Sequence, residues 1–331
     1  MAGHIRPFKQ IQRALSKRDI DAALELIWSA DDLQQTDKKG KKSVADLLTA
    51  HRDFTAIMTR LLVEKGIDAD VNLGDAFAPM SLLRYCVLTE NTELARVALE
   101  QGARVDRVFD SGYTLVHDAA AKNNAELIEL LRSFGADIDR ASADDNDAAA
   151  TPLHVAASRG NIDAARALLE QGADVNTPNH RGQTTLHIGA REKSTDLVAL
   201  ALAHDVDLDL RSRSGRTALH EAANKRAPSI TAYLLARGAS VDIADHDGWT
   251  ALHVACARGE VDCVRALITS GASLGVGTTQ DVRLRSVEVQ AGSTPLEIAR
   301  AMNQRKIEQI IETEDTTVAL DELVASSFPS T

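Results

Sequence analysis

Short amphipathic segments dominate the hydropathy pattern of the chain. Apolar residues recur at helical spacing over residues 11–16 and again over residues 20–27, with a charged turn at 17–19 between them. Near the other end, Ile307, Ile310 and Ile311 have the same spacing. Apolar side chains three and four positions apart lie on one face of a helix, so the pattern predicts short helices that pack in pairs.

One segment has a different period. Residues 282–285 and 287–289 alternate between apolar and polar side chains. An alternation with period two is typical of a β-strand with two unlike faces. The sequence therefore predicts a β-finger at this point, between two helical segments.

A short phrase recurs at a fixed interval through the centre of the chain. Thr151, Thr184, Thr217 and Thr250 succeed one another at intervals of 33 residues, and each has a leucine two positions later and a histidine three positions later. A fixed period of this length is the signature of a repeat architecture, in which one elongated body grows by stacking. The threonine precedes a helix, where its hydroxyl can cap free N–H groups.

This phrase and its period resemble the ankyrin repeat. Gly182, Gly215 and Gly248 each stand two residues before a threonine. Gly172-Ala173 closes a repeat, and the Asp174-Val175-Asn176 that follows is the usual ankyrin phrase. The resemblance implies an all-α fold, an α-solenoid with short β-hairpin fingers. We expect a curved ankyrin repeat array of about nine units with atypical end caps.

The repeats and their interruptions divide the chain into consecutive segments. These are an N-terminal capping repeat at 1–36, degenerate repeats two and three at 37–108, repeats four and five at 109–178 with an acidic inserted finger at 142–150, regular repeats six to eight at 179–273, an extended β-finger insertion at 274–293, a C-terminal capping repeat at 294–315 and a tail at 316–331. The tail has apolar residues at helical spacing, and it either packs onto the last repeat or acts as a free peptide motif. In the sixth repeat Asp205 stands where glycine is expected, which requires a left-handed backbone or a different turn.

Charge and composition narrow the function classes. The net charge of −11 disfavours a general nucleic-acid binder, which needs a basic surface. No apolar run approaches the roughly 20 residues of a membrane span, and residues 1–10 lack the apolar core of a signal peptide. The three cysteines do not make a disulfide framework. We therefore expect a cytoplasmic protein, with the nucleus or a host cytosol as alternatives.

The repeated histidines have a structural explanation. In the ankyrin family this imidazole bonds backbone between adjacent repeats, and equivalent histidines one repeat apart cannot converge on one ion. His253, Cys256 and Cys263 are candidate metal ligands by type, but a zinc site needs three or four converging ligands and no fourth is evident. We expect core cysteines, no metal, no cofactor, no catalytic residue and no enzymatic activity.

Candidate binding residues are given by the repeat register. In the ankyrin family the hairpin tips and first helices form a concave face that most often binds a protein. The residues predicted on this face are mainly basic, and they are Tyr113, Lys122, Arg159, His180, Arg181, Arg191, Arg211, Arg213, Arg216, Lys225, His246, Trp249 and Arg258. Trp249 is expected to be exposed beside Arg216 and Arg258. Acidic residues such as Asp245 and Asp247 lie near the same face, so a scattered surface charge is the alternative to a basic groove.

The sequence thus predicts a protein-protein interaction module, acting as a scaffold, adaptor or inhibitor. It would bind a protein partner with an acidic or phosphorylated surface on the concave face of repeats four to eight. The alternative is an acidic sequestering protein, such as an immunity or antitoxin protein or a host-targeted bacterial effector. Nucleic-acid binding and membrane binding are disfavoured, and the chain is expected to be monomeric on its own.

Overall fold

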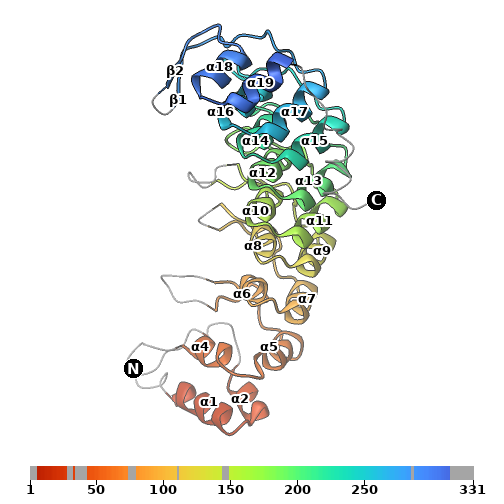
Figure 1. The fold of residues 1–331 in the computed structure, drawn as a ribbon. Coiled ribbons are helices and arrows are strands. Elements are labelled where there is room, and N and C mark those ends of the chain that lie inside the picture. The colour runs from red at the N-terminus through yellow and green to blue at the C-terminus, as the bar shows by residue number, and fades with distance from the viewer. Residues whose placement is uncertain are drawn as a thin grey trace. The chain divides into compact units, whose positions relative to one another are not determined.

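A computed structural model gives the fold in two compact bodies (Figure 1). It describes residues 6–27, 33, 43–73, 80–109, 112–143, 149–284 and 287–313. The N-terminal body comprises residues 1–138 and the C-terminal body residues 139–331. The tip of the predicted acidic finger, residues 144–148, and the predicted tail, residues 316–331, lie outside the described residues.

The N-terminal body consists of four helix pairs among its described residues. The pairs are α1 (Arg6–Ser16) with α2 (Ile20–Leu26), α4 (Val44–Thr49) with α5 (Phe54–Val63), α6 (Leu82–Leu88) with α7 (Thr92–Glu100), and α8 (Leu115–Ala121) with α9 (Ala125–Ser133). The helices predicted over 11–16 and 20–27 are thus present as α1 and α2.

The C-terminal body continues the same design with five more pairs. These are α10 (Pro152–Arg159) with α11 (Ile162–Glu170), α12 (Thr185–Glu192) with α13 (Thr195–Leu202), α14 (Ala218–Asn224) with α15 (Pro228–Ala236), α16 (Ala251–Arg258) with α17 (Val261–Thr269), and α18 (Pro295–Ala301) with α19 (Arg305–Thr313). Nine pairs in the described part of the chain confirm the expected repeat solenoid of about nine units.

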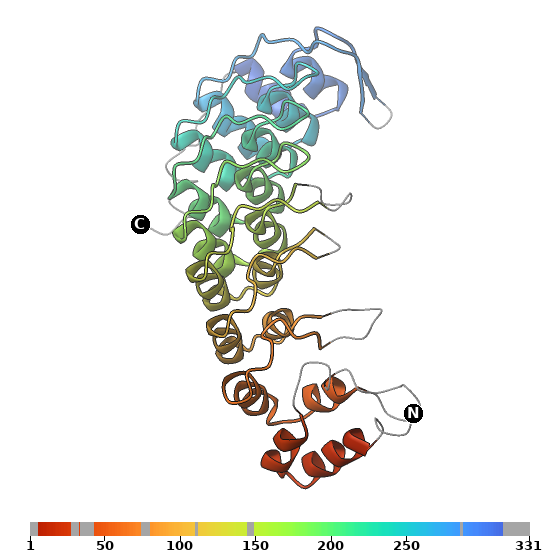
Figure 2. The same ribbon diagram turned by 180° about the vertical axis from the view of Figure 1, so that it is seen from behind.

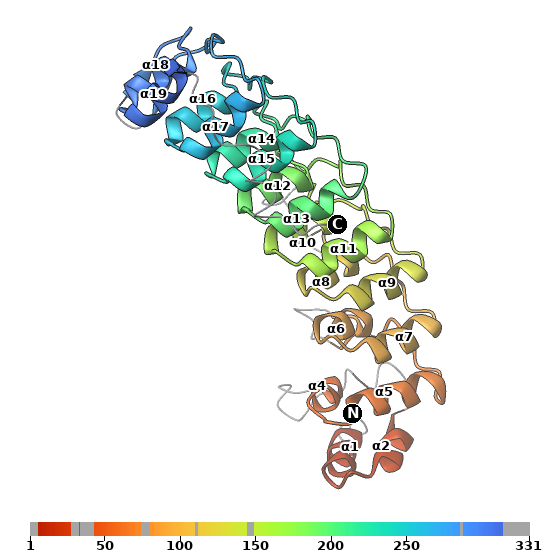
Figure 3. The ribbon, with the colours of Figure 1, turned by 45° about the vertical axis from the view of Figure 1, so that its right-hand side comes forward.

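Within the C-terminal body the first helices of successive repeats lie side by side, and the second helices form a parallel row (Figure 3). Alanines such as Ala222 and Ala223 of α14 are fully buried, which lets the backbones of α12, α14 and α16 approach closely. Leucines such as Leu186 and Leu219 fill the space between them and are almost inaccessible to solvent. The core is therefore a layer of small and branched side chains that is repeated along the body.

The shared start of each regular first helix explains why the phrase repeats. At Thr217 the threonine hydroxyl and the backbone N–H lie 2.9 Å and 3.1 Å from Nδ1 of His220, which closes a capping box. On the other side of the ring, Nε2 of His220 lies 2.9 Å from the carbonyl oxygen of Trp249 in the next repeat. This histidine thus ties the start of its own helix to the following hairpin, as the family resemblance implies.

The hairpins of consecutive repeats are also joined through their backbones. The N–H of Arg213 donates to the carbonyl of Arg181 (2.9 Å), and the N–H of His246 donates to the carbonyl of Ser214 (3.0 Å). The ladder continues where the N–H of Thr279 donates to the carbonyl of Asp247 at 2.9 Å. The hairpins of repeats six, seven and eight are therefore held against one another, and the inserted finger extends the same ladder.

Two strands lie where the alternating segment predicts them. β1 (Val282–Leu284) pairs with β2 (Val287–Val289) in an antiparallel hairpin, with Arg283 opposite Glu288. The hairpin projects to one side of the last helix pair (Figures 1 and 2). Val289 is buried, and β2 contacts α18, so the finger is anchored on the ninth repeat.

The sequence predicts either a left-handed backbone at Asp205 in the sixth repeat or a turn of a different form, and the structure has the different turn. Asp205 does not have a positive φ, whereas Gly172 and Gly238, at the equivalent positions of other repeats, do. Its carbonyl instead accepts from Nδ2 of Asn176 (2.8 Å), and Oδ1 of Asn176 accepts from the N–H of Asp207 (2.8 Å). A side-chain amide of the preceding repeat therefore stabilises this turn.

Candidate functional site

The histidines of the repeated phrase and the two cysteines of the C-terminal body are buried in structural roles. Burial lowers the pKa of His220 to about 4, and it lowers the pKa values of His187 and His253 as well. Burial raises the pKa of Cys263 to about 12, so that thiol is unreactive at neutral pH. No cluster of three potential metal ligands occurs among the described residues.

The predicted binding residues fall into two positional groups. His180, Arg181, Arg211, Arg213, Arg216 and His246 lie in the hairpins, whereas Arg159, Arg191, Lys225 and Arg258 lie at the ends of first helices. Cations at a helix C-terminus are favoured by the helix dipole, which gives the second group a structural explanation as well. Tyr113 and Lys122 belong to the N-terminal body, where the ring of Tyr113 stacks on His117 with centroids 4.8 Å apart.

Several of these cations already have partners within the chain. Arg211 donates through Nε to the carbonyl of Gly215 (3.1 Å) and through Nη2 to that of Ala244 (2.6 Å). Arg191 donates to Gln183 and Glu192 at 2.8 Å and 2.9 Å. These two arginines stabilise the hairpins, so a basic residue in this region is not by itself a contact for a partner.

Other predicted binding residues are exposed to solvent and do not stabilise a hairpin through a side-chain bond. Among the described residues, the side chains of Arg213, Lys225 and Arg159 make no hydrogen bond or ion pair and are exposed to solvent. His246 is also exposed, and Arg181 is exposed with Nε directed at His180 at 3.2 Å. The hairpin ladder brings Arg181, Arg213 and His246 together on consecutive repeats.

The expectation for Trp249 was wrong, because its side chain is buried and only 4% exposed. The residue before each threonine supplies the carbonyl that the histidine of the preceding repeat bonds, as Gln183, Arg216 and Trp249 do for His154, His187 and His220. That bond holds the residue before the threonine against the first helix of the preceding repeat. Gln183 is buried for the same reason, and Arg216 is half-buried.

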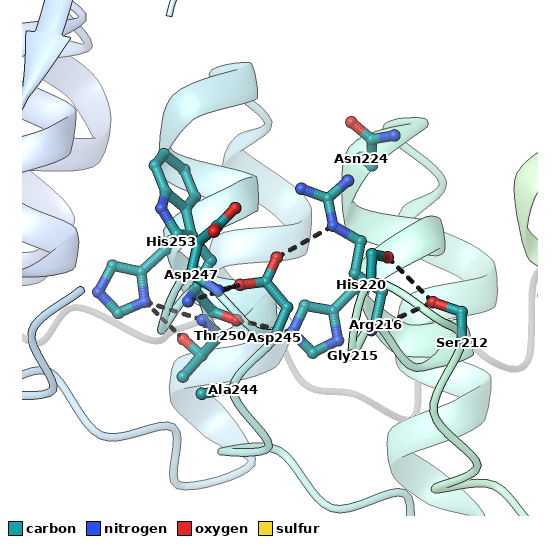
Figure 4. A network of polar contacts seen from close by, with 12 residues as sticks. Ser212, Gly215, Arg216, His220, Asn224, Ala244, Asp245, Asp247, Thr250 and His253 are labelled. Carbon is teal, nitrogen blue, oxygen red and sulfur yellow. Dashed lines mark hydrogen bonds and ion pairs between the residues drawn. The ribbon is translucent and has the colours of Figure 1, made fainter. Parts of the chain in front are cut away.

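Arg216 is joined to the next repeat through an ion pair (Figure 4). Its Nε lies 3.1 Å from Oδ2 of Asp245, whose side chain is only 2% exposed. The other carboxylate oxygen, Oδ1, accepts from the N–H groups of Asp247 (3.0 Å) and Trp249 (2.9 Å). Asp245 thus shapes its own hairpin and fixes the guanidinium of Arg216.

A pocket of about 200 Å³ lies next to this ion pair. We call it the arginine pocket, and it is lined by Arg216, Asn224, Arg226, Trp249, Val254, Ala257, Arg258, Arg283, Leu284 and Met302. The structure therefore brings together Arg216, Trp249 and Arg258 of the predicted set, with Arg226 and Arg283 beside them. The remaining predicted residues lie outside its lining.

Sequence reasoning missed the apolar lining and Asn224. Asn224 accepts from Nε of Arg258 at 2.8 Å, which positions that guanidinium. Val254 and Met302 stand on α16 and next to α18, where their apolar character suggests only a core role. The signal that could have pointed to Asn224 is its position, which directly precedes the predicted contact Lys225.

No helix among the described residues is both long and apolar enough to cross a membrane.

Comparisons with known proteins agree on the type of repeat. A family model described as ankyrin repeats, in three copies, matches residues 47–142, 83–179, 153–245, 186–278 and 233–316. The solved ankyrin repeat domain of Bcl-3, from the IkappaB protein family, has a TM-score of 0.58 and 26% identity, over 69% of this chain and 98% of that one.

Two curated proteins show similarity over shorter stretches. The ankyrin repeat protein FPV014 of fowlpox virus (strain NVSL) is 34% identical over 110 residues, which is 33% of this chain and 24% of that protein. Protein phosphatase 1 regulatory subunit 27 of Mus musculus is 33% identical over 90 residues, which is 27% of this chain and 56% of that protein. The matches thus span about a quarter to about a half of these relatives.

Proposed function

The chain belongs to the ankyrin repeat family, and from this we propose that it is a non-enzymatic module that binds one protein partner. Stacked repeats of this kind create extended surfaces that suit a protein rather than a small molecule. The name of one relative, a regulatory subunit of protein phosphatase 1, is in keeping with a role exerted on another protein. The proposed roles are scaffold, adaptor or inhibitor.

We place the main contact on the hairpins of repeats six to eight and on the first helices beside them. The observation that carries this proposal is the hydrogen-bonded ladder that aligns exposed Arg181, Arg213 and His246 on consecutive repeats. Lys225 and Arg258 are exposed at the ends of α14 and α16 in the same repeats. The partner would offer acidic or phosphorylated groups to these cations, over about 800 Å² per side. For Arg159 of repeat five and for Tyr113 and Lys122 of repeat four, partner contact stays a prediction.

The test is a pull-down from the native cell lysate with an Arg181→Glu/Arg213→Glu variant. We expect this variant to lose a protein that the wild-type chain retains, because charge reversal places carboxylates opposite the acidic partner. The matched control is Arg166→Glu/Lys306→Glu, which makes the same charge change at exposed positions on the second helices α11 and α19. A protein retained equally by both variants would contradict this site and favour the acidic surface of the sequestering alternative.

A further inference from the structure

We propose that the arginine pocket binds a phosphorylated side chain of the protein partner. The pocket lies within the C-terminal body, where repeats seven, eight and nine meet the inserted finger. The proposal rests on the proposed function for the statement that the ligand belongs to a protein. The pocket combines four guanidinium groups, the indole of Trp249 and an apolar wall.

All the charged residues that line the pocket are basic. Four of its lining residues are arginines and none is acidic. The guanidinium groups of Arg226 and Arg283 make no hydrogen bond or ion pair with any residue that the structure describes. Arg216 uses Nε for Asp245, which leaves its terminal nitrogens without a protein partner among the described residues. Arg226, Arg258 and Arg283 are exposed to solvent, so their charge is available to attract an anion into the pocket.

Trp249 provides an independent observation, because a polar group of this lining residue has no acceptor within the described part of the chain. Its side chain is only 4% exposed, and its Nε1–H has no hydrogen-bond partner among the described residues. Buried indole N–H groups usually find a partner, because leaving one unsatisfied costs free energy. The backbone N–H and carbonyl of Trp249 are both bonded, to Asp245 and His220, so the ring is held where it lines the pocket.

The apolar residues of the pocket favour a ligand in which the anion is attached to a hydrocarbon group. Val254, Leu284 and Met302 are apolar, and they line the same space as the guanidinium groups. A free inorganic anion would leave these walls without contacts, whereas a side chain with a hydrocarbon body would cover them. A phosphate ester supplies nearly two negative charges and three acceptor oxygens, which match several arginines better than one carboxylate does. A phosphorylated side chain therefore fits both halves of the pocket.

The backbone of Arg226 offers a way to separate binding from folding. Arg226 has φ of 58°, in the left-handed region, at a turn where Gly160 and Gly259 stand in the equivalent places of repeats five and eight. A side chain with a Cβ atom is strained in this conformation and glycine is not. The Arg226→Gly variant should therefore fold at least as stably as the wild type while it removes one guanidinium from the pocket.

The experiment is a titration of the full chain with phenyl phosphate, followed by the fluorescence of Trp249 in a Trp28→Phe background. The chain has only two tryptophans, so this background leaves Trp249 as the single reporter. We expect saturable binding of phenyl phosphate, weaker binding of inorganic phosphate and none of p-cresol, which lacks the anion. Arg226→Gly and Arg283→Gln should each weaken phenyl phosphate binding by about tenfold. Arg166→Gln, on α11, should leave binding unchanged.

Two results would overturn the proposal. One is the absence of saturable phenyl phosphate binding, and the other is an affinity that Arg226→Gly and Arg283→Gln leave unaltered while both variants fold. The proposed function can fail separately. If the lysate protein is still retained after phosphatase treatment of that lysate, the interaction module stands and the phosphate pocket does not. If phenyl phosphate binds as expected but no protein is retained, the affinity of the pocket for a phosphate ester stands, and the claim that a protein partner carries that phosphate fails with the proposed function.

Discussion

Arg84 in the third repeat and Arg216 in the seventh repeat both hold an aspartate of the following repeat, but they differ in what they leave open. Nε of Arg84 lies 3.0 Å from Oδ2 of Asp118, and its Cζ lies 3.8 Å from the centre of the Phe109 ring. Arg216 makes a similar ion pair with Asp245 at 3.1 Å, yet its guanidinium also lines a pocket with three other arginines. An arginine that can serve a partner is thus identified by what already binds it, rather than by its presence in a basic stripe.

The two regions also differ in how a first helix is tied to the next repeat. Repeats five to eight use a buried imidazole that bonds a backbone carbonyl, as His187 does at 2.9 Å. The third repeat has Arg84 at that position, and Ser81 caps α6 with its own hydroxyl. The C-terminal body therefore depends on buried imidazoles that bond backbone carbonyls, whereas the third repeat depends on an ion pair.

The largest expected effect comes from removing the two aspartates. Asp245→Ala should lower the free energy of unfolding of the C-terminal body by about 3–5 kcal/mol, because it leaves two backbone N–H groups and one half-buried guanidinium unpaired. Asp118→Ala should cost about 1–3 kcal/mol, since the Asp118 side chain is 11% exposed and Arg84 keeps its ring contact. Urea denaturation measures both. Equal decreases in the free energy of unfolding for Asp245→Ala and Asp118→Ala would contradict the distinction between the two ion pairs.

Lowering the pH should also lower the free energy of unfolding of the C-terminal body. The pKa of His220 is about 4 in the folded chain and 6.5 in the unfolded chain, so the unfolded state binds more protons between these values. Stability should be fully present above pH 6.5 and be lost as the pH falls towards about 4, by about 3 kcal/mol from His220 alone. His187 and His253 act in the same direction.

The measurement is urea denaturation against pH, followed by Trp249 fluorescence in the Trp28→Phe background. The control is His220→Asn, which should be less stable at pH 7 but should show a shallower pH dependence. A slope that is the same in both proteins would mean that the imidazole of His220 is not the titrating group.

The repeat period predicted the fold because the threonine and histidine perform the same local task each time. The capping box and the bond to the next hairpin require those two residue types at that spacing, so the phrase alone specifies the helix start and the stacking partner. The same logic could have corrected the expectation for Trp249. Its position is occupied by Gln183 and Arg216 in other repeats, and these polar residues conceal the burial that the histidine bond imposes.

The arginine pocket could not be predicted in this way. It joins Arg216 and Arg226 of the seventh repeat to Arg283 of the finger and Met302 of the ninth repeat. The finger interrupts the period, so the repeat register says nothing about which side chains it faces. The partners of each arginine likewise depend on side-chain geometry, as the contrast between bonded Arg211 and unbonded Arg213 shows among the described residues.

The most direct test of the contrast between the two regions is a ¹H–¹⁵N NMR titration of the chain with phenyl phosphate. We expect the indole N–H signal of Trp249 to shift and saturate, because the indole lines the pocket that the phosphate fills. We expect the Nε–H signal of Arg84 to stay in place, because Asp118 and Phe109 already hold that guanidinium. A shift of Arg84 as large as that of Trp249, or a Trp249 signal that does not move, would contradict this contrast.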